Sequence, residues 1–281
     1  MDESRYSRNT ALFGTVGQAQ IAATSATIVG LGGLGAHVAQ QLAYLGVVQF
    51  GLIDDDIVTE SSLNRVIGTT PAHVLARTSK VRAAEALILA VQPDAKINAV
   101  QAKVTRDRQD EAGELIRSSD IVFGCLDRES PRLFLTDLCS AFAITYIDLA
   151  TDTGGETEDW YGGRVVVCDG SRCLSCLDLL DQRQIRLEQM TDEEREIERR
   201  IYGLSVDALG STGPAIVSVN GVVASLAVTE FMAHQTDLRP AAPQLIYRGD
   251  LSRVTLSRDA ARPGCPYCAR WPATRTVLPQ A

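Results

Sequence analysis

Four cysteines, arranged as two pairs that lie far apart in the chain, have the residue type and spacing of metal ligands. Each pair is a CxxC motif, and the four residues are Cys173, Cys176, Cys265 and Cys268. Four thiolates from two short turns suit tetrahedral zinc, and a site with four protein ligands leaves no open position for water. A redox-active pair is the alternative, but two pairs beside a nucleotide-binding pattern favour zinc. We therefore predict a structural zinc site that joins two distant segments.

A glycine-rich segment, GLGGLG, and an acidic run about 20 residues later form a second pattern. Glycines between a strand and a helix allow the backbone to approach phosphate oxygens at a helix N-terminus. A carboxylate after the next strand can hold ribose hydroxyls. The candidate nucleotide-binding residues of this pattern are Gly30, Gly32, Gly33, Gly35, Asp54 and Asp56. This pattern indicates a nucleotide but does not separate NAD from ATP.

Three charged residues favour a triphosphate with magnesium. Arg65 lies in SSLNRV, Lys80 lies in a mostly apolar helical pattern, and Asp127 follows an apolar segment in GCLDR. A bound nucleoside triphosphate needs cations for its phosphates and a carboxylate for its metal ion, whereas a nicotinamide needs no metal carboxylate. Arg65 alone would suit a salt bridge, and Lys80 alone would suit a helix surface. Their placement together with Asp127 favours the phosphate interpretation.

Short apolar segments alternate with helical patterns through the first half of the chain. We expect strands at 26–31, 47–53, 95–101, 119–127 and 143–150, with helices at 36–46, from Thr70 onward and at 131–143. Five such alternations predict an α/β fold, a Rossmann-like and mostly parallel sheet with helices on both faces. Ligands of such sheets bind beyond the carboxyl ends of the strands, where the acidic candidates would meet.

The pattern changes after residue 150. We expect a strand at 162–169, a charge-dense segment at 181–200, a long apolar helix at 213–234 and an antiparallel pair of strands at 244–259. The charged segment is either a solvated helix or a segment that crosses over an active site. Because no linker or repeat interrupts the chain, we predict one domain over residues 1–281, with a nucleotide-binding half (1–150) and a zinc, crossover and substrate half (151–281).

The composition excludes several classes of function. The net charge of −8 argues against nucleic acid or an anionic membrane as the main partner, and 5% aromatic residues argue against base stacking. The sequence has no apolar run of about 18 residues, and its polar N-terminus lacks a signal-peptide core. We expect a cytoplasmic protein, in which a disulfide framework is disfavoured.

Taken in order, GLGGLG, IDDD, SLNR, Lys80, CLD and the two CxxC motifs resemble the ubiquitin-activating-enzyme-like superfamily, and its ThiF/MoeB/HesA branch most closely. The resemblance extends from about Arg5 to Ala269 and includes RYSRN at 5–9. It implies ATP-dependent adenylation of the C-terminal carboxylate of a ubiquitin-like or sulfur-carrier protein that ends in Gly-Gly. It also implies ATP, magnesium and zinc as cofactors, and a homodimer.

The resemblance assigns a role to each matching position. It implies that Asp54 binds the ATP ribose, with Asp56 and Asn64 nearby, that Arg65 and Lys80 hold the phosphates, and that Asp127 holds magnesium. Arg8 would reach into the site of the partner subunit, and the four cysteines would bind zinc. Two positions depart from the family pattern SNLNRQ: Ser62 replaces an asparagine and Val66 replaces a glutamine.

Many members of this family carry a thioester-forming cysteine in the crossover segment, but residues 177–212 contain none. Cys125, Cys139 and Cys168 lie elsewhere, and we expect them to be small buried side chains. One outcome is that the reaction stops at the acyl-adenylate, which a sulfur donor or an amine then consumes. The other is an oxyester on Ser205 or Ser211, although the segment has no histidine to activate a serine.

Other activities use the same residues. Adenylation of a short peptide, as in the maturation of peptide antibiotics, needs the same site as adenylation of a ubiquitin-like protein. A conjugating enzyme or a sulfur donor would be a further partner. GxGxxG with Asp54 also fits an NAD-dependent oxidoreductase, but no acid or base suited to hydride transfer is evident. A non-catalytic dimer partner is the remaining alternative, suggested only by Ser62 and Val66.

Overall fold

The computed structural model of the protein describes residues 4–104, 110–154, 159–202, 215–257, 259 and 261–271. Its strands form one sheet with the order β3-β2-β1-β4-β5-β6-β7-β8. The strand bounds are β1 Ser25–Val29, β2 Gln49–Ile53, β3 Lys96–Val100, β4 Ile121–Gly124, β5 Thr145–Thr153, β6 Tyr161–Cys168, β7 Gln244–Arg248 and β8 Arg253–Leu256. The strands from β3 to β5 pair in parallel, and those from β5 to β8 pair antiparallel. The predicted mostly parallel α/β sheet with antiparallel strands added is confirmed.

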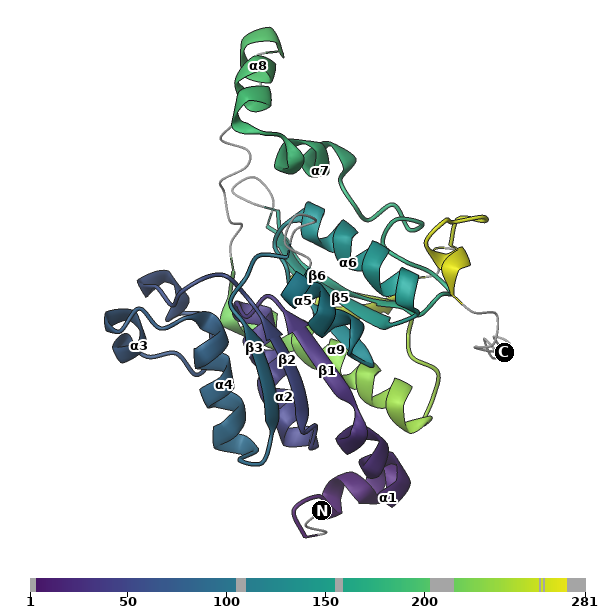
Figure 1. Ribbon diagram of the computed structural model, residues 1–281. Helices are drawn as coiled ribbons and strands as arrows, with labels where there is room; N and C mark the ends of the chain where they lie inside the picture. Colours follow the sequence, from purple (N-terminus) through teal and green to yellow (C-terminus); the bar gives the residue numbers. More distant parts are fainter. Residues whose placement is uncertain are drawn as a thin grey trace.

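Helices cover both faces of this sheet (Figure 1). Helices α2, α4 and α9 bury side chains such as Val38, Ile88 and Phe231 in one apolar cluster with the sheet. Helices α5 and α6 bury Ile116 and Leu138 in a second cluster. The bounds are α1 Ser7–Ala23, α2 Gly33–Leu45, α3 Pro71–Leu75, α4 Lys80–Val91, α5 Asp110–Arg117, α6 Glu129–Phe142, α7 Gln182–Gln189, α8 Asp192–Tyr202 and α9 Val217–Thr236, with 3-10 turns at Glu60–Ser62 and Cys268–Arg270.

The helix predicted from Thr70 onward is two helices. Helix α3 ends at Leu75, and the backbone then passes through a left-handed residue, Arg77, with φ 50°. Ser79 is the residue before α4, and a β-bridge joins it to Ile57. Lys80 is therefore the first residue of α4, where it adjoins the end of the acidic run, rather than a residue in the middle of a helix face.

The predicted strand 119–127 is shorter than expected, because β4 ends at Gly124. Residues 125–128 form the connection to α6, which places Asp127 on a loop. Among the described residues, α9 alone is long and apolar enough to pass a composition test for a membrane span. Its side chains Val223, Ala227 and Phe231 are fully buried in the apolar cluster that lies against the sheet.

The charge-dense segment forms α7 and α8. Helix α7 buries Ile185 and packs against α6, whereas α8 extends away from the sheet (Figure 1). Ser205 and Ser211, named above as candidate nucleophiles, lie outside the described residues.

Candidate active site and metal centre

The carboxyl ends of β1, β2 and β4 meet at one edge of the sheet. In the parallel registers, Val29 of β1 lies opposite both Ile53 of β2 and Gly124 of β4. The connections that follow are held together, since the Gly30 N–H donates to the Ile53 carbonyl over 2.8 Å. After β1 the chain turns to α2 on one face, and after β4 it turns to α6 on the other. Such a point, where the strand order reverses, is where doubly wound sheets bind ligands.

The glycine-rich turn is shaped by close backbone contacts. Gly30 has φ +87°, and a β-carbon there would lie 2.5 Å from the Cys125 carbonyl oxygen. A β-carbon at Gly35 would lie 1.9 Å from the Gly30 carbonyl oxygen, so neither position tolerates a side chain. A β-carbon at Gly32 would have no atom within 4 Å. The space beside Gly32, the N-cap residue of α2, is therefore open, and the free N–H groups of the helix N-terminus favour an anion there.

Asp54 braces this turn from the end of β2. One carboxylate oxygen accepts the Leu31 N–H over 2.6 Å, and the other accepts the Asp56 N–H over 2.8 Å. Burial raises the pKa of Asp54, while the Lys80 charge and the two backbone donors lower it. The carboxylate expected to bind ribose thus has a backbone donor on each oxygen, and it fixes the shape of the phosphate-facing turn.

Asp56 and Lys80 form an ion pair at the same edge. The Lys80 ammonium lies 2.7 Å from the Asp56 carboxylate, whose side chain is 62% exposed against 14% for the lysine. The Lys80 N–H also donates to the Asp56 carbonyl over 2.9 Å. The lysine is therefore held beside the acidic run. Because Asp56 is exposed, another anion can take its place as the partner of Lys80.

The segment around Arg65 lies beside the glycine-rich turn. A β-carbon at Gly33 would lie 3.4 Å from the Arg65 carbonyl oxygen. The Arg65 guanidinium donates to the Ser61 carbonyl and to the exposed Asn64 side chain. Ser62, which stands where the family has asparagine, is buried and accepts the Thr59 N–H over 3.2 Å, so it caps a local turn.

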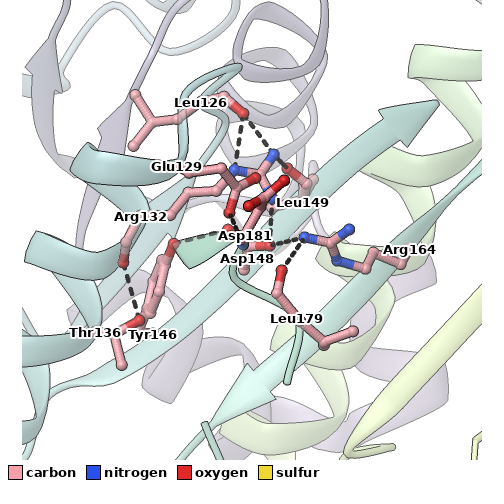
Figure 2. Close-up of polar contacts among 10 residues, drawn as sticks. All are labelled: Leu126, Glu129, Arg132, Thr136, Tyr146, Asp148, Leu149, Arg164, Leu179 and Asp181. Carbon is pink, nitrogen blue, oxygen red and sulfur yellow. Dashed lines mark hydrogen bonds and ion pairs between the residues drawn. The ribbon is translucent and has the colours of Figure 1, made fainter. Parts of the chain in front are cut away.

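A buried network fixes the chain just before Asp127 (Figure 2). Arg132 donates to the Leu126 carbonyl through two nitrogens, at 3.2 and 2.5 Å. Its guanidinium also lies 3.0 Å from Asp148, which is fully buried and accepts the Tyr146 hydroxyl over 2.7 Å. Burial is the largest influence and lowers the pKa of Arg132, but the surrounding acidic groups, Asp148 foremost, together outweigh it and raise the arginine pKa. None of these contacts was predicted from the sequence.

Two features of the sequence indicate the buried Arg132–Asp148 network. Arg132 stands among apolar residues in PRLFL, and Asp148 is the one charged residue of the predicted strand 143–150. Charges at such positions are buried only with partners. Asn220 was also missed. It is 2% exposed, accepts the Thr151 hydroxyl over 3.3 Å, and its amide nitrogen packs where a β-carbon of Gly33 would stand.

Arg8 lies far from these residues, at the opposite edge of the sheet. Its neighbour Tyr6 accepts a hydrogen bond from Gln92, which follows the last residue of α4. Helix α1 itself ends directly before β1 begins, at the amino ends of the strands (Figure 1). Arg8 is exposed there and is separated from the site of its own chain by the length of the parallel strands.

The four cysteines of the CxxC motifs come together as predicted. Their sulfur atoms all lie within 4.8 Å of one another, with 3.6 Å between Cys173 and Cys265 and 3.8 Å between Cys176 and Cys268. Zinc–sulfur bonds of about 2.3 Å place the ligands of a tetrahedron about 3.8 Å apart, whereas a disulfide needs about 2 Å. A hydrogen bond with Cys268 lowers the pKa of Cys173 to about 5, as suits a thiolate ligand. The cluster fits a zinc ion.

The remaining thiols are poor nucleophiles. Cys139 and Cys168 are buried as expected from the sequence, whereas Cys125 is only half-buried. Burial raises the pKa of all three, so the reactive thiolate is disfavoured.

Comparisons with known proteins give this arrangement a family. The ThiF family model matches residues 6–265, so the chain belongs to the ThiF family. The adenylyltransferase and sulfurtransferase MOCS3 of Drosophila willistoni is 37% identical over 144 residues, which are 50% of this chain and 30% of that protein. The SAMP-activating enzyme E1 of Haloferax volcanii is 33% identical over 175 residues, which are 62% of this chain and 61% of that protein. The matches thus span less than two thirds of the length of each of these relatives.

Solved structures share the fold over nearly the whole chain. The structure of MccB of E. coli with ATP has a TM-score of 0.73 at 17% identity and covers 95% of this chain and 75% of its own. MccB with MccA-N7isoASN has a TM-score of 0.75 at 17% identity, with the same coverage. At this identity the likenesses show the fold, and they agree with the family match.

Proposed function

From membership of this family, we propose that the chain adenylates the C-terminal carboxylate of a ubiquitin-like or sulfur-carrier protein that ends in Gly-Gly. The observation that carries the proposal is the edge formed by β1, β2 and β4. There, a glycine-rich turn braced by Asp54 meets two cations, Arg65 and Lys80, and the free carboxylate of Asp127. A nucleotide alone would need the turn, but only a triphosphate with a metal ion uses the whole set.

In this proposal the nucleotide lies along the N-terminus of α2. Lys80 exchanges its bond with Asp56 for a phosphate oxygen, and Arg65 holds a second phosphate from the neighbouring segment. Asp54 accepts ribose hydroxyls, because each of its oxygens holds one backbone amide and keeps a second acceptor site. The exposed carboxylate of Asp56 is released beside it. Asn64 lies exposed beside Arg65 and completes the binding edge.

Asp127 would hold magnesium. Its carboxylate is exposed, accepts no hydrogen bond within the described part of the chain, and offers the hard oxygen ligands that magnesium prefers. When bound, this ion supplies neutralisation of the charge that develops on the triphosphate. A carboxylate oxygen of the substrate attacks the α-phosphorus, and the bond from that phosphorus to the oxygen that bridges to the β-phosphate breaks. Pyrophosphate leaves, and the positive charges of Arg65 and Lys80 stabilise its negative charge.

The acyl-adenylate is the expected end product of this chain. Because residues 177–212 contain no cysteine, we propose that a sulfur donor or an amine, such as one presented by a conjugating enzyme, consumes it. An oxyester on Ser205 or Ser211 stays as an alternative. Adenylation of a short peptide is the second candidate function, and the likeness to MccB bound to a MccA peptide derivative over 95% of this chain favours it.

We also propose a homodimer in which Arg8 acts in the partner's site, because Arg8 lies at the edge opposite its own site. The Arg8→Ala variant is expected to lose about a hundredfold in adenylation rate, as is typical for a removed charge-stabilising group. Mixed dimers of Arg8→Ala and Asp127→Ala subunits are expected to regain activity, since one of their two sites receives an intact Arg8 and an intact Asp127. Rate measurements on co-expressed, differently tagged subunits check this. No recovery in purified mixed dimers would contradict action between subunits.

Trapping of the acyl-AMP product tests the proposed function and separates its two forms. The protein would be incubated with ATP labelled in the α-phosphate and with either Gly-Gly-terminated proteins or short peptides, and the products identified by mass spectrometry. An adenylated protein C-terminus supports the first form, and an adenylated peptide supports the second. Binding of NAD in place of ATP would contradict both.

A further inference from the structure

Asp127 has no side-chain anchor of its own. Its carboxylate is exposed, and the described part of the chain offers it no hydrogen bond or ion pair. The position of this carboxylate therefore depends on the backbone on either side of it, between the end of β4 at Gly124 and the start of α6 at Glu129. A group that holds a metal ion and reactive phosphates needs a fixed position, because displacements of about 1 Å are costly in rate.

The backbone before Asp127 is anchored in the core. Arg132 binds the Leu126 carbonyl through two nitrogens and is itself held by Asp148. Both side chains are almost fully buried, at 4% and 0% exposure. This side of the loop is fixed by elements of the sheet and of α6 alone.

The backbone after Asp127 is anchored from outside, by α7. The N-cap residue of α6, Arg128, gives no side-chain cap, so the first amides of the helix need acceptors from elsewhere. Glu188 supplies an acceptor for each of the first two amides. Its carboxylate oxygens accept the Glu129 N–H over 3.3 Å and the Ser130 N–H over 2.8 Å. Gln189 adds a bond to the Ser130 hydroxyl over 3.2 Å.

The contact is reciprocal. Glu129 of α6 accepts the Asp181 N–H at the start of α7 over 3.3 Å, and Asp181 in turn caps α7 through the Arg183 and Gln184 amides. Apolar packing of Ile185 adds to the contact between the helices. Each helix therefore supplies an acceptor to the N-terminus of the other, and α7 is held directly beside the Asp127 loop.

We infer that Glu188 is a positioning residue for Asp127, which makes adenylation depend on the docking of α7 against the N-terminus of α6. The inference rests on the proposed function. It extends that function by giving the charge-dense segment a role: the segment completes the reactive loop only when docked. A substrate or partner that moves α7 would thereby change the adenylation rate without contacting the nucleotide.

The test compares Glu188→Ala and Glu188→Gln with a matched control, Glu193→Ala, which removes an exposed carboxylate from neighbouring α8. The first readout is hydrogen–deuterium exchange of the nucleotide-free protein. Loss of the cap is expected to speed exchange of the Glu129 and Ser130 amides about fivefold in Glu188→Ala, and not elsewhere in the sheet. Glu188→Gln keeps an accepting oxygen, so its exchange rates at these two amides are expected to lie between those of wild type and Glu188→Ala. The Glu193→Ala control is expected to exchange at the wild-type rate.

The second readout is steady-state ATP–pyrophosphate exchange. Glu188→Ala is expected to lower kcat roughly tenfold and raise the magnesium concentration at half-saturation, with the KM for ATP within about twofold of wild type. Unchanged amide exchange and unchanged kcat would overturn the inference. Faster amide exchange throughout the protein with a lower melting temperature would also overturn it, because Glu188 would then be structural only. A wild-type protein that catalyses no adenylation would refute the proposed function, while the amide exchange result would still test the cap.

Discussion

Replacing Asp127 with alanine is expected to lower the rate of adenylation about a thousandfold while leaving the fold intact. The large effect follows from the loss of both the metal ligand and the neutralisation that the metal provides at the reacting phosphates. The fold is expected to persist because the Asp127 side chain is exposed and makes no hydrogen bond within the described residues. Rates of acyl-AMP formation and thermal melting curves of the two proteins check both parts.

Asp94→Ala is the matched control for this variant. Asp94 is an exposed aspartate on the turn between α4 and β3, at the opposite edge of the sheet, so its loss is expected to leave the rate unchanged. An Asp127→Ala protein that keeps more than a tenth of wild-type activity would remove Asp127 from the reaction and leave the metal to other carboxylates, of which Asp55 and Asp56 are exposed candidates.

Replacing one zinc-cluster cysteine, such as Cys176→Ser, is expected to lower the free energy of unfolding by about 5 kcal/mol. This is a fraction of the roughly 10–16 kcal/mol with which structural zinc binds small domains. The loss is large because the cluster joins the segment after β6 to the last described segment of the chain, and because three of its sulfur-bearing residues are buried. Buried thiolates without a cation would repel one another.

Zinc content by elemental analysis and denaturant unfolding measure this effect. Cys139→Ala is the control, since Cys139 is buried in α6 outside the cluster and its loss is expected to cost only about 1 kcal/mol. Wild-type protein that carries no zinc, or a Cys176→Ser variant as stable as the control, would contradict a structural metal site.

The sequence predicted the framework of the fold because its signals are local. Short apolar runs mark β1, β2 and β4. A glycine-rich turn follows β1, and aspartates follow β2 and β4, so their order implies the parallel sheet and the shared edge. The two CxxC motifs are recognisable from their spacing alone. They come together because the first follows β6 and the second follows β8, and the pairing of both strands with β7 places their ends at the same end of the sheet. These features depend on spacing along the chain, which a single sequence displays directly.

Features that depend on tertiary contacts were not predictable in the same way. The break between α3 and α4 follows from a β-bridge between Ser79 and Ile57, which places Lys80 at a helix start. The cap that Glu188 gives to α6 joins residues 59 positions apart, and nothing in the charge-dense segment distinguishes this glutamate from its neighbours. Asp54 shows the same limit, since its position was expected but its two backbone partners were not.

The measurement that most directly tests the central claim is ATP–pyrophosphate exchange with labelled pyrophosphate, run with candidate proteins and peptides that end in Gly-Gly. The account predicts label in ATP only when magnesium and one such carboxylate substrate are present, and none with Asp127→Ala or when the substrate's C-terminal carboxylate is converted to an amide. Absence of exchange with every candidate, in a protein that also fails to bind magnesium-ATP, would contradict an adenylating enzyme.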